Sequence, residues 1–231
     1  MLRFDDLTLE QIIFEVRFPD GFLYWDRCGS VWRSISHKWP HLKMMEINPQ
    51  HARLRLSDDD IEMSFSHNRI GIHQDYPKSL NTFKVFTNDS CEILLDAIEV
   101  NLFSRVGNRY KYIYGIEDHK KIIEFFEKSQ LVTIPEKAKK IGESIREPSI
   151  RFIIERNDIS ITISVAYFKR NLELSIPKPL EINTKEFISQ GISIDLDFFS
   201  TKIVSRGTFN AEDFIKTHEK SSQRVIEQIF S

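Results

Sequence analysis

Three cations lie on one face of a predicted strand in the middle of the chain. The segment RVGNRYKYIY spans residues 105–114, and its alternation predicts a β-strand. Arg105, Arg109 and Lys111 then share one face, while Tyr110 and Tyr112 share the other. Cations backed by aromatic side chains could bind phosphates or an acidic protein surface. These five residues form a candidate binding site, and the competing interpretation is a solvated strand face over an aromatic core.

Two carboxylates and a histidine form a second candidate set near the end of the chain. Asp195 and Asp197 point the same way from a predicted strand and could offer oxygen ligands to Mg²⁺ or Mn²⁺. His218 lies on the apolar face of a predicted last helix, either as a hydrogen-bonded core residue or as a binding residue. Alternating acidic residues also suit a solvated strand face. We therefore expect no bound metal and no cofactor.

A third polar set follows from three short strands predicted between residues 52 and 72. Matching their apolar residues across two turns places Arg55, Glu62 and His73 in one cross-strand row. Such a row could serve acid–base chemistry, but a surface ion-pair row is the interpretation we favour.

Composition excludes several familiar kinds of site. The chain has 231 residues with only eight glycines, and none of their spacings is that of a dinucleotide fingerprint, a P-loop or a nucleophile elbow. The net charge of −2 argues against a strongly basic nucleic-acid-binding protein. Cys28 and Cys91 are typical of reduced thiols, and the acidic start lacks the apolar stretch of a signal peptide. We expect a cytoplasmic protein that does not associate with membranes.

Short strands and amphipathic helices must position these residues. Helices are predicted at about 22–38, 79–103 and 117–128 and after residue 210, and residues 88–90 offer a break in the second. Strands are predicted at about 12–18, 52–56, 61–65, 70–72, 105–114, 152–154, 161–165, 172–176 and 192–198, with a turn at 169–171. This order predicts an α+β fold in which antiparallel sheets carry long amphipathic helices on one face.

The order of elements repeats along the chain. Residues 1–116 and residues 117–231 each carry a run of strands and a long helix. We therefore expect two structurally similar halves, packed as two domains or as one, with a hinge between residues 116 and 148.

Three stretches of this sequence resemble a sporadically distributed family of uncharacterised bacterial proteins. They are FEVRFP at residues 14–19, RVGNRY at residues 105–110, and IDLD at residues 194–197 followed by Thr217-His218. The resemblance covers nearly the whole chain, although Asn108 stands where the family has an apolar residue. It implies carriage on mobile-element or defence-associated gene clusters and no particular activity.

The leading functional hypothesis is a non-catalytic protein that works through protein–protein contact. It would act as a homo-oligomer or as part of a complex, with its 12% aromatic residues supplying interface anchors. One alternative is a nucleic-acid-binding protein that uses Arg105, Arg109 and Lys111. Another is a metal-dependent nuclease-like enzyme that uses Asp195, Asp197 and a histidine.

Overall fold

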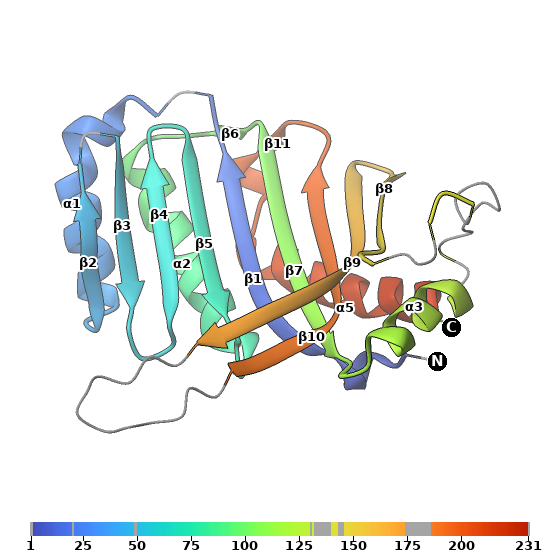
Figure 1. Cartoon of the computed structure of the whole chain (residues 1–231). Helices are drawn as coiled ribbons and strands as arrows, with labels where there is room; N and C mark the ends of the chain where they lie inside the picture. The colour runs from blue at the N-terminus through green and yellow to red at the C-terminus, as the bar shows by residue number, and fades with distance from the viewer. Residues whose placement is uncertain are drawn as a thin grey trace, which may run out of the picture.

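A nine-stranded antiparallel sheet dominates the protein (Figure 1). This computed structural model describes residues 2–19, 21–48, 50–129, 131, 140–142, 146–173 and 186–230, with the backbone alone at 171–173 and 186–188. The strand order is β2-β3-β4-β5-β1-β7-β10-β9-β8. The strands are β1 (Thr8–Arg17), β2 (Leu42–Ile47), β3 (His51–Leu56), β4 (Ile61–Ser66), β5 (Arg69–Asp75), β7 (Arg105–Gly115), β8 (Ser149–Arg156), β9 (Ile159–Glu173) and β10 (Glu186–Ser200). The short strands β6 (Leu102–Phe103) and β11 (Val204–Ser205) form a separate pair.

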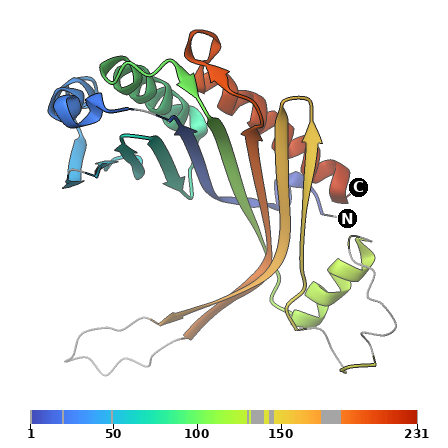
Figure 2. The same ribbon diagram turned by 90° about the horizontal axis from the view of Figure 1, so that it is seen from above.

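Three long helices cover one face of this sheet. Figure 2 shows α1 (Leu23–Lys38), α2 (Leu80–Ala97) and α5 (Ala211–Phe230) on the same side, while α3 (His119–Lys128) lies at the β8 end. Apolar residues at alternate positions of β1 are fully buried beneath them, as expected for a half-buried strand. The predicted α+β fold, with helices packed on one face of an antiparallel sheet, is confirmed. Among the helices of the described ranges, none has the length and apolar character needed to cross a membrane.

A similar order of strands occurs twice, with four strands outside β1 and three outside β7. In the first set β1 pairs with β5, and β4, β3 and β2 follow outward. In the second set β7 pairs with β10, and β9 and β8 follow outward. β1 and β7 pair antiparallel at the centre, so residues 1–116 and 117–231 contribute strands to one continuous sheet. Although β7 lies within residues 1–116, it is the innermost strand of the second set, just as β1 is the innermost strand of the first set.

One local prediction is confirmed in detail. Arg55 pairs with Glu62, and Glu62 with His73, as the register of the three short strands predicted. Asn210 caps α5, since its Oδ1 accepts a hydrogen bond of 2.8 Å from the backbone N–H of Asp213.

Two predicted interruptions are wrong. α2 continues through residues 88–90, where Ser90 is buried and the Asn88 side chain donates to Glu92 one turn later. The turn predicted at 169–171 is part of β9, which pairs with β10 as far as Glu173. Tertiary pairing overrides the local preference of polar residues for turns at this point. Most of the strand predicted at 172–176 lies outside the described residues.

A long hairpin projects from the sheet as an arm. The pairing of β10 with β7 begins at Gly191, whereas residues 186–190 pair with residues 169–173 of β9 alone. Figure 2 shows this arm, which we define as residues 169–173 and 186–190, extending away from the side that carries α1, α2 and α5. The arm therefore stands over the face of the sheet that those helices leave open.

Candidate functional site

Arg105 lies at the start of β7, on the open face of the sheet. Its guanidinium lies 2.6 Å from Glu15 of β1 and 2.9 Å from Asp197 of β10, and it stacks 4.7 Å above the ring of Phe199. The guanidinium also fills the space above Gly107, where a Cβ atom would lie 3.1 Å from it. The chain's own side chain thus occupies the space above Gly107.

The other two predicted cations of β7 are also paired with carboxylates. Arg109 Nε donates a hydrogen bond of 2.7 Å to Asp195 of β10, which lies diagonally across from it, opposite Lys111 in the register. Lys111 Nζ lies 3.1 Å from Glu10 of β1. Each of the three cations predicted on this face of β7 therefore has a carboxylate partner, and two of these carboxylates are shared: Glu15 by Arg105 with other arginines, and Glu10 by Lys111 with Arg170.

The two predicted tyrosines lie on the opposite, helix-covered face. Tyr110 donates a hydrogen bond of 2.8 Å to the carbonyl of Ile215, and the hydroxyl of Tyr112 lies 2.8 Å from Ser222 Oγ. Asn108 donates to the Tyr110 hydroxyl from the same buried face. Burial raises the pKa of Tyr110 well above its usual value and raises the pKa of Tyr112 to about 12. Both tyrosines therefore stay neutral and attach the sheet to α5.

His218 also belongs to the core. It is 6% exposed and packs between Phe198 and Phe214, with ring centroids 5.0 Å and 4.2 Å away. Its Nδ1 donates to the carbonyl of Phe214 at 2.8 Å. Burial lowers the pKa of His218, and the hydrogen bond to Phe214 only partly opposes this effect.

The residues of the second candidate set do not converge. Asp195 and Asp197 face the open side and pair with arginines, whereas His218 lies beneath α5 on the other side. Burial raises the pKa of Asp197, and the positive charge of Arg105 only partly offsets it. Within the ranges that the structure describes, no group of three or more His, Cys, Asp or Glu side chains could hold a metal ion.

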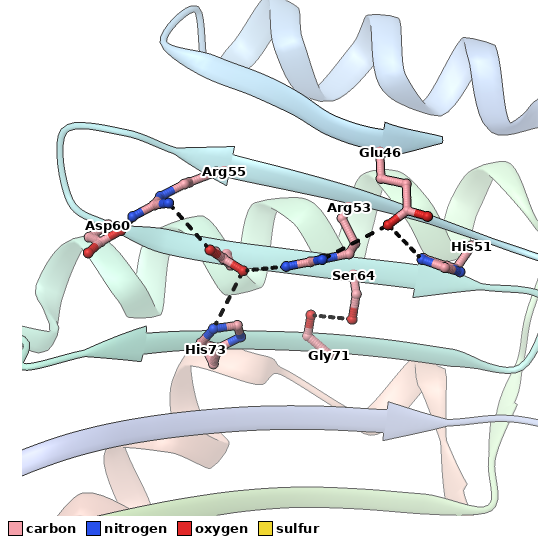
Figure 3. A network of polar contacts seen from close by, with 9 residues as sticks. Glu46, His51, Arg53, Arg55, Asp60, Ser64, Gly71 and His73 are labelled. Atoms are coloured by element: carbon pink, nitrogen blue, oxygen red, sulfur yellow. Dashed lines mark hydrogen bonds and ion pairs between the residues drawn. The ribbon is translucent and has the colours of Figure 1, made fainter. Parts of the chain in front are cut away.

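The predicted row on the short strands is a network of ion pairs. Glu62 lies 3.2 Å from Arg53, 3.6 Å from Arg55 and 3.7 Å from His73. Arg55 Nε also donates to Asp60 at 2.9 Å, and Figure 3 shows how these side chains point toward one another across β3, β4 and β5. The hydrogen bond to Asp60 raises the pKa of Arg55. The arrangement fits the surface ion-pair row.

Three arginines stand side by side where β1 ends. Arg17 pairs across the strands with Arg69 of β5 and with Arg105 of β7, so the three are direct neighbours. We call them the arginine row. The carboxylate of Glu15 forms an ion pair with all three guanidiniums, at 2.8 Å from Arg17, 3.6 Å from Arg69 and 2.6 Å from Arg105. The row combines surplus positive charge with a single shared carboxylate.

A hollow of about 420 Å³ adjoins the arginine row. Its walls include Arg53 and Arg69, the hydroxyls of Ser64 and Ser66, and Asn68 in the turn between β4 and β5. Ser66 Oγ donates to Asn68 Oδ1 at 3.0 Å, so the turn holds its polar groups in place. Cations, hydroxyls and an amide thus surround one concave part of the open face.

Arg170 attaches the arm to the middle of the sheet. Its guanidinium donates to the carboxylate of Glu10 and, at 3.0 Å, to the hydroxyl of Tyr76. The same guanidinium lies 5.1 Å above the ring of Phe168. Glu10 is only 8% exposed beneath these groups. This contact joins a distant hairpin to β1.

The two edge strands of the sheet differ. β2 carries exposed Met44 and Met45, but its register with β3 shifts at a bulge between Met44 and Glu46. β8 pairs with β9 without any shift from Ser149 to Arg156, and it exposes Ile153 (58%) and Ile154 (45%). Bulges protect sheet edges from pairing with other chains, so β8 is the less protected edge.

Sequence reasoning missed the carboxylates and arginines that surround the predicted cations. Glu15 and Arg17 belong to the FEVRFP stretch but were not singled out as site residues, and Arg69 and Arg170 lay in segments without a motif. Their importance depends on β1 lying between β5 and β7, which local periodicity does not specify.

Comparisons with known proteins bring no assignment to this site. No protein-family model matches the chain, and a search of curated proteins finds no match either. The resemblance to a sporadically distributed bacterial family, including the Asn108 departure, stays a prediction. The functional argument therefore depends on the geometry alone.

Proposed function

We propose that this protein is a non-catalytic, cytoplasmic binding protein that works through protein–protein contact and pairs with a second copy of itself along β8. The observation that carries the proposal is the unprotected edge strand, whose regular backbone and exposed isoleucines are typical of a strand that accepts another strand. Two such edges, joined antiparallel, would form a closed two-fold dimer with one continuous sheet.

The residues of β8 complement one another when Ile153 faces Ile153 of the second copy. On the open face this register sets Arg151 opposite Glu155 of the second copy, twice in the dimer by symmetry. On the helix-covered face it sets Phe152 opposite Ile154. Opposite charges and large apolar pairs across strands each contribute about 0.2–1 kcal/mol. The sequence of β8 is thus suited to pairing with itself.

The two alternative functions receive less support from the geometry. Nucleic-acid binding through Arg105, Arg109 and Lys111 would require cations that are now paired with carboxylates. A metal-dependent nuclease would require Asp195 and Asp197 as ligands, yet arginines hold both. Cys28 and Cys91 are free thiols in the described chain, which supports the proposal that the protein works in a reducing compartment.

Sedimentation and light scattering test the proposed dimer. We expect dimers at about 100 μM, and Glu155→Arg should weaken dimerisation about tenfold because it sets like charges opposite each other at two places. Adding Arg151→Glu to that variant restores opposite charges and should restore the dimer. Met45→Lys on β2 is the matched control at the other edge.

Two results would overturn the proposal. The first is a strictly monomeric wild-type protein at about 100 μM. The second is a dimer that Glu155→Arg leaves intact, because the proposed register makes those two charge pairs unavoidable.

A further inference from the structure

We propose that the arginine row and the adjoining hollow bind the terminal phosphate of a small phosphomonoester. The site is distinct from the edge strand β8. It is formed by the ends of β1, β5 and β7 on the open face of the sheet, where Arg17, Arg69 and Arg105 converge.

The charges of the row are not balanced by its own carboxylates. Like charges directly opposite each other across strands repel, and Arg17 has an arginine on both sides. Three guanidiniums share Glu15, and among the residues that the structure describes, Arg105 alone has a second carboxylate partner, Asp197. Three positive charges therefore meet two negative ones. An added anion would reduce the repulsion.

The row also has more hydrogen-bond donors than its carboxylates can accept. Three guanidiniums carry about fifteen N–H donors, whereas two carboxylates offer about eight lone-pair positions. The side chains of Arg17 and Arg69 are each 52% exposed, so their remaining donors are accessible. A phosphate dianion accepts the paired donors of guanidinium groups, which favours arginine over lysine at such sites.

The backbone under the row allows the guanidiniums to converge. Glu15 lies between Gly71 and Gly107 in the cross-strand pairing. Arg69 extends over Gly71 and Arg105 over Gly107, where a Cβ atom would lie 3.6 Å and 3.1 Å from their Nη atoms. Both side chains therefore lie along the sheet and point to the same carboxylate from opposite sides.

Convergence favours one phosphate group over a nucleic-acid backbone. A backbone carries a line of charges, whereas Arg109 and Lys111, which continue along β7, already lie against carboxylates. In the row, three guanidiniums converge on the single carboxylate of Glu15. The hollow beside it, with Ser64, Ser66 and Asn68 in its walls, can hold the organic part of a small ligand.

Calorimetric titration of the full chain with inorganic phosphate and with adenosine monophosphate tests this site. At about 0.15 M salt, which screens non-specific attraction, we expect dissociation constants below about 1 mM. Arg17→Gln and Arg69→Gln should each weaken binding about tenfold or more, because each removes charge-assisted hydrogen bonds. Arg33→Gln, an exposed arginine on α1, is the matched control and should change nothing.

A gain of affinity separates a binding site from a purely structural network. Glu15→Gln removes the negative charge that competes with the ligand, so phosphate should bind about fivefold more tightly. Adenosine and an oligonucleotide without a terminal phosphate should bind much more weakly than the monophosphate. The proposal is overturned if phosphate gives no binding at about 10 mM, if Arg17→Gln and Arg33→Gln behave alike, or if the oligonucleotide binds as tightly as the monophosphate.

Discussion

Glu10 connects three strands through a single carboxylate. It pairs with Lys111 of β7 and with Arg170 of β9, while β1 supplies its backbone. Burial alone would raise the pKa of Glu10, but the hydrogen bonds from Lys111 and Arg170 outweigh that effect and lower it. Because the pKa is lower in the folded state, the ionised form of Glu10 stabilises the fold above the pKa of the unfolded chain.

This pairing predicts a dependence of stability on pH. The contribution of Glu10 is present at neutral pH and is lost as the pH falls below about 4.5 and through the lowered pKa of the folded state. Glu10→Gln should therefore reduce the free energy of unfolding by about 1–3 kcal/mol at pH 7 and by much less near pH 3. Urea unfolding across this pH range measures the difference.

Glu124, an exposed carboxylate that pairs with a lysine, is the matched control for Glu10. Glu124 pairs with Lys128 at 3.0 Å on the surface of α3, where both side chains are more than half exposed. Glu124→Gln should change stability by less than about 0.5 kcal/mol. A difference between wild type and Glu10→Gln that stays constant with pH would contradict the assigned role of Glu10.

At the scale of single residues, the sequence predicted which face of a strand a side chain lies on, but not which residues that side chain pairs with. The alternation of β7 correctly separated the cations from Tyr110 and Tyr112. The partners of Arg105 lie about ninety residues away in either direction of the chain, at Glu15 and Asp197. No local pattern relates residues so distant, and so neither the ion pairs nor the arginine row could be anticipated.

At the scale of elements, the base of the arm depends on one glycine. Gly191 lies opposite Gly115, where β10 begins to pair with β7. A Cβ atom on Gly191 would overlap the backbone carbonyl of Tyr114, whereas a Cβ atom on Gly115 would meet open space. The backbones of β7 and β10 therefore approach closely at the Cβ position of Gly191 but not at that of Gly115.

The glycine pair predicts opposite outcomes for two similar substitutions. Gly191→Ala should destabilise the protein by about 2–3 kcal/mol, because backbone atoms must move to admit the methyl group. Gly115→Ala should be neutral or slightly stabilising, since alanine restricts the unfolded chain more than glycine does. Thermal and urea unfolding of both variants check this. Equal effects would mean that the close approach does not hold in solution.

The elements that sequence predicted well are those with one face in the core. β1, β3, β4, β5 and β7 bury alternate residues under helices, and this burial leaves a clear period of two. β2 was missed because Leu42 is its only buried residue. Within the arm, residues 169–171 were predicted to form a turn because they are polar and, away from the helices, have no apolar face to reveal the strand.

At the scale of the whole molecule, the central β1–β7 pair joins the two sets of strands. Nine residue pairs connect these strands, from Thr8 opposite Ile113 to Arg17 opposite Arg105. Separating the sets would break this ladder and expose the fully buried residues beneath it. We therefore expect one cooperative unfolding unit, as is usual when a hydrophobic core is continuous.

Two spectroscopic probes can test this cooperativity. All three tryptophans, Trp25, Trp32 and Trp39, lie in or next to α1, so their fluorescence reports on the first set of elements. Far-ultraviolet circular dichroism reports on both sets. The two urea transitions should share one midpoint. Separate midpoints would show that the halves unfold independently.

The pairing of β1 with β7 brings two distant stretches of the sequence together. About ninety residues separate FEVRF and RVGNRY along the chain. In the sheet they are cross-strand neighbours, with Phe14 opposite Asn108 and Val16 opposite Val106. All four side chains are buried together. A substitution in one stretch therefore changes the packing of the other, and the two form one structural unit.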